Sequence, residues 1–167
     1  MRKWLSITLI FLVVAVSMTA CSTKGTKNII SEALSLDVSS GNEVSNYDTH
    51  SGNGDGISYI VFSFKDDAVL TEIQENAEWK AFPLDEIVQT LVYGVEDETS
   101  KNGPYLTDDD GKPLVPKIQN GYYLLIDRQV KKDEATGADI LHRSSFNFDL
   151  GLYDTDTNTL YFCQLDT

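Results

Sequence analysis

Residues 144–166 have the sequence SSFNFDLGLYDTDTNTLYFCQLD, which predicts two long strands joined by a polar turn. From Phe146 to Tyr153 the pattern is mostly an alternation of apolar with polar or small residues, the two-residue period of a strand with one buried face and one wet face. Asp154 to Asn158 are turn-forming residues, and Asn158 tolerates the left-handed conformation that a tight reversal needs. Because a lone hairpin is not stable in water, other strands and a helix must cover its apolar face.

The remaining segments predict an α+β fold. Residues 57–65 and 122–130 have the composition of strands, and residues 34–38 alternate as a short first strand would. Apolar residues at helical spacing predict helices near residues 69–77 and 83–94. We therefore expect a mainly antiparallel sheet of four or five strands with two helices packed on one face, in a single domain over residues 34–167.

Residues 1–21 combine the features of an export signal. Arg2 and Lys3 form a basic start, residues 5–16 are an apolar run, and small residues precede Cys21. Met18-Thr19-Ala20-Cys21 resembles the lipobox of bacterial lipoproteins, although that family more often has Leu in place of Met18 and Ala or Ser in place of Thr19. The alternative is an uncleaved anchor, since residues 4–23 carry no charge.

The resemblance implies a lipid-anchored protein on the extracytoplasmic face of the cell membrane. Residues 1–20 would be a signal peptide, Cys21 would carry the lipid, and residues 21–33 would hold the lipidated cysteine and a flexible tether, because residues 22–31 are small and polar. With Cys21 lipidated, Cys163 has no partner in its own chain, so the fold does not depend on a disulfide. No basic residue adjoins Cys163, which favours a small buried hydrophobe over a reactive thiol.

The composition is strongly acidic. The 167 residues include 13 basic and 26 acidic side chains, a net charge of −13, and removal of residues 1–20 would take away Arg2 and Lys3 and bring the charge to −15. Such a chain repels phosphate backbones, which excludes nucleic acid as a partner, and its membrane attachment must come from the lipid rather than from a basic surface.

Motifs for catalysis are missing from the sequence. His50 and His142 are its only histidines, and neither belongs to a motif of a nucleophilic hydrolase, a phosphate-binding loop or a zinc site. We therefore predict no catalytic residue and no cofactor. Residues 46–56, with three glycines, two aspartates and His50, are the loop most typical of a functional site, although the same composition suits a plain surface connection.

Calcium is the metal to consider. Asp154, Asp156 and Asn158 match the first three ligand positions of an EF-hand loop. Thr159 and Leu165, however, stand where that loop needs glycine and a bidentate glutamate. We predict an ordinary hairpin turn without metal, and a calcium-dependent adhesion module is kept as an alternative.

Binding residues are expected on the uncovered face of the sheet. If both helices cover one face, the other would present Tyr123, Asp127, Asp149 and Tyr153, and aromatic and acidic groups side by side suit a sugar or peptide ligand. The same pattern suits an ordinary half-exposed sheet.

Three further stretches resemble the small acidic lipoproteins of Gram-positive bacteria: residues 48–50, 120–123 and 153–161. That resemblance implies no activity and no site residue. We expect a binding or envelope-accessory domain with a protein or cell-wall ligand, and an extracellular hydrolase that uses carboxylates is the alternative.

Overall fold

The computed structural model describes residues 25–96, 99–130 and 139–167. Within this part the chain divides into two compact units, the first ending at Ser39 and the second running from Ser40 to Thr167. Cys21 and the predicted signal peptide lie outside the described residues. None of the described helices is long and apolar enough to cross a membrane.

The first unit corrects two predictions. Residues 25–34 are helical, so the short strand predicted for residues 34–38 is wrong, and so is the irregular structure predicted for residues 25–31. Ser31, in the last turn of this helix, accepts two hydrogen bonds from the residues that follow the helix. Its carbonyl oxygen accepts from Leu36 N at 3.1 Å, and its Oγ accepts from Val38 N at 3.2 Å. All three apolar residues of this segment, Leu34, Leu36 and Val38, are buried, although the segment is not a strand.

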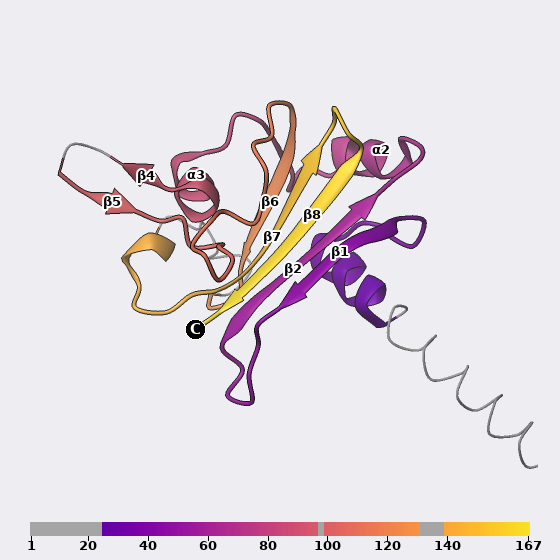
Figure 1. The fold of residues 1–167 in the computed structure, drawn as a ribbon. Helices are drawn as coiled ribbons and strands as arrows, with labels where there is room; N and C mark the ends of the chain where they lie inside the picture. The colour runs from indigo at the N-terminus through magenta and orange to yellow at the C-terminus, as the bar shows by residue number, and fades with distance from the viewer. Residues whose placement is uncertain (1–24, 97–98, 131–138) are drawn as a thin grey trace, which may run out of the picture. The chain divides into compact units, whose positions relative to one another are not determined.

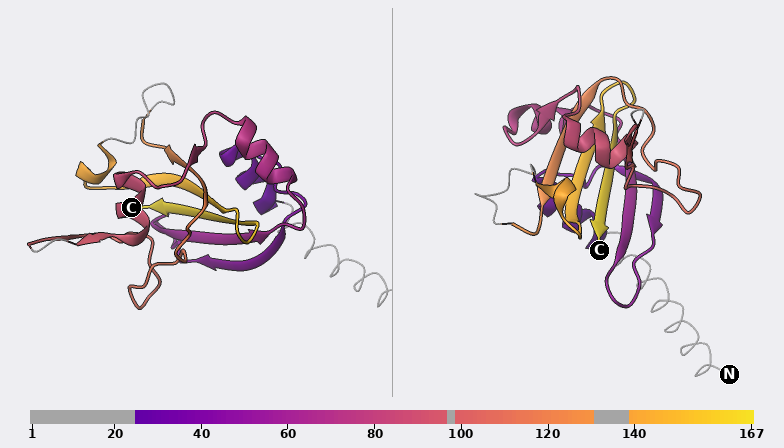
Figure 2. Two further views of the ribbon diagram at one scale, coloured as in Figure 1. Left: turned by 90° about the horizontal axis from the view of Figure 1, so that it is seen from above. Right: turned by 90° about the vertical axis from the view of Figure 1, so that its left-hand side faces the viewer.

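The second unit is built on a six-stranded antiparallel sheet in the order β1-β2-β8-β7-β6-β3 (Figure 1). The elements are β1 (Asn42–Asp48), β2 (Gly56–Ser63), α2 (Ala68–Glu75), β3 (Lys80–Ala81), α3 (Glu86–Tyr93), β4 (Val95–Glu96), β5 (Lys101–Asn102), β6 (Gly121–Asp127), the 3-10 helix η1 (Ile140–His142), β7 (Asn147–Asp154) and β8 (Thr159–Asp166). Strands β4 and β5 form a separate hairpin that projects away from the sheet (Figure 2). The α+β class and the mainly antiparallel sheet are thus confirmed.

The sheet has six strands where four or five were predicted. Strand β1 was missed because its sequence, NEVSNYD, is mostly polar and exposed and shows little alternation. Strand β3 was missed because it has only two residues.

The β7–β8 hairpin lies at the centre of the sheet, as the sequence predicts. Its register runs from Asn147 opposite Asp166 to Asp154 opposite Thr159. In the turn, Asn158 has a left-handed φ of 50°. Asp154 accepts hydrogen bonds from the backbone N–H of Asp156 and the hydroxyl of Thr157, both at 2.9 Å, so the turn satisfies its own polar groups.

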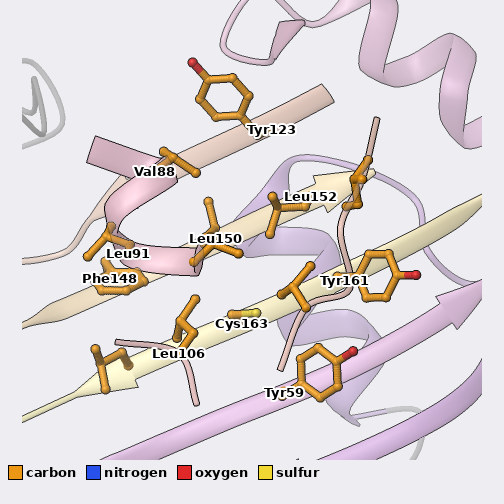
Figure 3. Packing of buried hydrophobic residues seen from close by; sticks show 14 of the residues in the cluster. Tyr59, Val88, Leu91, Leu106, Tyr123, Phe148, Leu150, Leu152, Tyr161 and Cys163 are labelled. Carbon is orange, nitrogen blue, oxygen red and sulfur yellow. The ribbon is translucent and has the colours of Figure 1, made fainter. Parts of the chain in front are cut away.

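One face of the sheet packs against α3. Side chains that alternate along β2, β7 and β8 form this core together with α3 and the segment after β5 (Figure 3). Its buried members include Tyr59, Val88, Leu91, Leu106, Phe148, Leu150, Leu152, Tyr161 and Cys163. Helix α3 begins at Asp85, whose side chain accepts from Val88 N at 2.9 Å, and ends at Gly94, whose φ of 73° favours glycine.

The opposite face packs against α2. Gln74 of α2 donates to the hydroxyl of Tyr122, which alternation places opposite Tyr123, and Asn158 of the hairpin turn donates to Asp67 at the start of α2. Val69 and Ile73 of α2 are buried, as are Leu124, Tyr153 and Leu160 on this face. The two helices therefore lie on opposite faces of the sheet, and the prediction that both pack on one face is wrong.

The first prediction concerns this register. Phe148 is completely buried, so Phe148→Ala should lower the free energy of unfolding by about 3 to 5 kcal/mol, the usual cost of emptying a packed core position. Val44→Ala, at a site that is 55% exposed on edge strand β1, is the control and should change it by less than about 0.5 kcal/mol. Urea unfolding of both variants measures the difference, and equal costs would contradict the register.

Candidate functional site

A groove at the β3 edge of the sheet is the cavity that we consider for ligand binding. Its volume is about 730 Å³, and its lining comes from α2, β3, the segment between β3 and α3, Gln89 and Tyr93 of α3, and the segment that leads into β6. That size is within the range of small-molecule sites in proteins. All of its lining residues belong to the second unit.

The lining of the groove is aromatic and amide-rich. Its aromatic, amide and basic side chains are those of Gln74, Phe82, Gln89, Tyr93, Lys117, Gln119, Asn120 and Tyr122, and aliphatic residues also line it: Leu70, Ala81, Leu84 and Ile118. Among the described residues that line it, none is acidic, although the chain carries twice as many acidic as basic residues. The groove is therefore a local exception to the acidic composition.

Internal bonds hold several of these side chains in place. Tyr93 donates from its hydroxyl to Pro116 O at 2.7 Å, and Lys117 Nζ lies 3.6 Å from the centre of the Tyr93 ring, a cation–π contact. Phe82 meets Tyr123 edge to face, with the ring centres 6.1 Å apart. These contacts hold the rings of Tyr93 and Phe82 in place.

Two predicted binding residues, Tyr123 and Asp127, lie on the α3 face of β6. Only 3% of Tyr123 and 4% of Asp127 is exposed. The Tyr123 hydroxyl donates to Asp85 at 3.1 Å. Arg143 binds both carboxylate oxygens of Asp127, and these hydrogen bonds hold the pKa of Asp127 below its usual value. The side chains of both residues are therefore used in contacts within the fold.

The other two predicted binding residues, Asp149 and Tyr153, lie on the opposite face of the sheet. Tyr153 is completely buried, and Asp149 is 7% exposed. Tyr123 pairs with Leu152, and directly paired residues share a face, so Tyr123 and Tyr153 point in opposite directions. The predicted surface that joins all four residues is not formed.

The candidate calcium ligands take part in the hairpin turn. Asp154 accepts the two turn hydrogen bonds, Asp156 accepts from the side chain of Asn120 at 3.0 Å, and Asn158 donates to Asp67. Among the described residues, no group of three or more His, Cys, Asp or Glu side chains has the arrangement of a metal site. Absence of a calcium site stays a prediction.

A polar cluster gathers where β1 and β8 end and β2 begins. We name it the His50 cluster: Asp48, His50, Ser58, Arg128, Asp149 and Asp166. The two ring nitrogens of His50 face carboxylates, Nδ1 at 2.9 Å from Asp48 and Nε2 at 3.2 Å from Asp166. Arg128 links Asp166, 2.7 Å away, to Asp149, whose Oδ1 lies 3.1 Å from Arg128 Nε. The loop before β2 is thus joined to the end of the chain.

The pKa values of three groups in the His50 cluster are shifted. Burial opposes the charged form of Asp48, but its hydrogen bonds to His50 and Ser58 outweigh it and lower the pKa of Asp48. Burial opposes the charged form of His50, but the hydrogen bonds to Asp48 and Asp166 outweigh it and raise the pKa of His50 above its usual value. For Asp149, burial raises the pKa, and Arg128 only partly offsets it.

Ser58 and His50 contact each other, and both also contact Asp48. Ser58 Oγ lies 3.2 Å from His50 Nδ1, but it also lies 3.0 Å from Asp48, and Asp48 accepts from Nδ1 as well. When His50 is protonated, both of its ring nitrogens donate to carboxylates, neither can accept the serine proton, and the Ser58 hydroxyl donates to Asp48. In this state the His50 cluster is a network of ion pairs and hydrogen bonds.

Sequence reasoning missed the groove. Gln89 and Tyr93 come from α3, Gln74 from α2, and Gln119 and Tyr122 from the segment around the start of β6. No motif joins residues that are spaced so widely. Cys163, in contrast, is buried as predicted, and burial raises the pKa of its thiol.

The second prediction concerns pH. A histidine whose pKa is raised by folding stabilises the fold below about pH 6.5, its unfolded value, and this stabilisation is lost as the pH rises through the higher folded value. The stability advantage of the wild type over His50→Gln should therefore be greatest near pH 5.5 and shrink towards pH 9, as measured by urea unfolding. His142→Gln, at an exposed site, is the control. A difference between wild type and His50→Gln that does not change with pH would contradict the ionic role.

Comparison with other proteins adds no further assignment. No protein-family model, no curated protein and no solved structure matches the chain. The groove and the His50 cluster are therefore interpreted from their own residues.

Proposed function

We propose that this protein is a lipid-anchored, extracytoplasmic binding protein, held to the membrane at Cys21, that takes its ligand in the β3-edge groove. The observation that carries the proposal is the groove itself. It has about 730 Å³ of space, aromatic and amide walls, and no acidic residue among the described residues that line it. Ligand sites in proteins are concave and use a few placed polar groups to fix the orientation of the ligand.

The chemistry of the described residues supports binding more than catalysis. A hydrolase that uses carboxylates needs acidic groups beside its substrate, and the described lining of the groove offers none. The buried carboxylates Asp127 and Asp149 are paired with Arg143 and Arg128. These acidic groups therefore serve the fold.

The anchor is supported by the sequence of residues 1–21. The apolar run would deliver the chain for export, the small Thr19 and Ala20 would admit a peptidase, and the thiol of Cys21 would take the diacylglyceryl group. Two acyl chains give stable membrane attachment without basic residues, which fits the net charge of −13.

The third prediction tests the anchor. When cells that produce the protein are fed labelled fatty acid, the wild type should take up label and Cys21→Ser should not, because the thiol that forms the thioether is gone. Cys163→Ala is the matched control and should stay labelled, since this thiol is buried. An unlabelled wild type whose N-terminus still precedes Cys21 would show an uncleaved anchor instead.

The fourth prediction tests the groove. We expect detergent-solubilised full-length protein to retain a component of a cell-envelope extract, and Ala81→Trp to lose that component because an indole would fill the groove. Ala77→Trp makes the same change at an exposed position outside the described lining and should behave as the wild type. Mass spectrometry of the retained material decides it. Equal retention by Ala81→Trp and wild type, with both folded by circular dichroism, would place binding elsewhere.

A further inference from the structure

We propose that the ligand of the β3-edge groove is a neutral oligosaccharide, an inference that rests on the proposed function and gives it a chemical class. The groove combines amide groups without a described hydrogen bond, fixed aromatic rings and a lining in which Lys117 is the one charged residue. Each of these features selects for a different property of the ligand.

The amides select for hydroxyl groups. The side chains of Gln89 and Gln119 line the groove and make no hydrogen bond to any other residue that the structure describes. A primary amide both donates and accepts, and a sugar hydroxyl does the same, so one amide can serve adjacent hydroxyls. Gln89 is half-buried and comes from a helix, so its position is set by the fold.

The aromatic rings select for a flat, partly apolar partner. Tyr122 is half-buried, and its hydroxyl accepts from Gln74 at 3.3 Å, which fixes the ring. Phe82 is fixed by its edge-to-face contact with Tyr123. Rings of this kind bury large area at low entropic cost, and the C–H faces of a pyranose supply a matching surface.

The charges select against ions. Lys117 is the one basic residue in the described lining, and its ammonium group already lies over the Tyr93 ring. Tight recognition of an anion uses charge-assisted hydrogen bonds, often bidentate, which this arrangement does not offer. A cationic ligand would need carboxylates, which the described lining lacks. A neutral ligand is the class that remains.

The sheet edge disfavours an extended peptide. A peptide that adds to a sheet needs a row of free backbone groups, and β3 has only two residues, both already paired with β6. Phe82 N donates to Gly121 O of β6, so the backbone groups of Ala81 point to the outer edge of the sheet. Pro83, two residues after Ala81, has no N–H to donate. Such a short edge cannot hold a peptide ladder.

The experiment uses three neutral probes with detergent-solubilised full-length protein in isothermal titration calorimetry. The probes are tri-N-acetylchitotriose, cellotriose and a tetra-alanine peptide blocked at both ends. We expect at least one saccharide to bind with a Kd below about 1 mM and the peptide not to bind. Gln119→Ala, at an exposed position, and Gln89→Ala should each weaken saccharide binding about 3- to 10-fold, the usual net value of one hydrogen bond.

The outcomes separate the ligand class from the proposed function. Gln129→Ala, a glutamine outside the described lining, should bind saccharide as the wild type does. Binding of the peptide alone, blocked by Ala81→Trp, would overturn the saccharide class and leave the binding function intact. Saccharide binding that neither groove glutamine affects would overturn the site. If no probe binds, the saccharide inference fails, and the retention experiment with Ala81→Trp still decides the function independently.

Discussion

Burial of the β7–β8 hairpin on both faces is the constraint on which the rest of the second unit depends. Seven of the eight residues of β7 are buried, so neither face of this strand can be left to water. Strands β2 and β6 pair with the hairpin on either side and satisfy its backbone groups. Helix α3 and the segment after β5 then cover one face, and α2 covers part of the other. A sheet covered on one face only would leave Tyr153 and Leu160 exposed.

The buried charges follow from the same constraint. Asp127 and Asp149 lie on strands whose faces are covered, and a buried carboxylate without a partner would cost several kcal/mol. Arg143 and Arg128 supply the partners, and His50 joins this network through Asp166. In a chain with few basic residues, these arginine side chains pair with buried carboxylates of the fold.

The groove has the opposite character because it lies at an edge. Strand β3 pairs with β6 at only two positions. The sheet is therefore short at this edge, and space is left there between residues of α2 and α3. Amide and aromatic side chains line much of the groove. The carboxylates of the His50 cluster lie inside the fold, whereas the described lining of the groove has Lys117 as its one charged residue, and this difference is the basis of the proposed binding role.

The sequence by itself determined the local elements of the fold: the β7–β8 hairpin with its turn at Asn158, strand β2, and helices close to the observed α2 and α3. These follow from alternation, helical spacing and turn chemistry, which act over a few residues. Tertiary structure decided which faces are covered, that Tyr123 pairs with Leu152 and so points away from Tyr153, and that glutamines from separate segments meet in one groove. Alternation divides a strand into two faces, but it does not say which neighbour or helix each face meets, because those contacts join residues far apart in the chain.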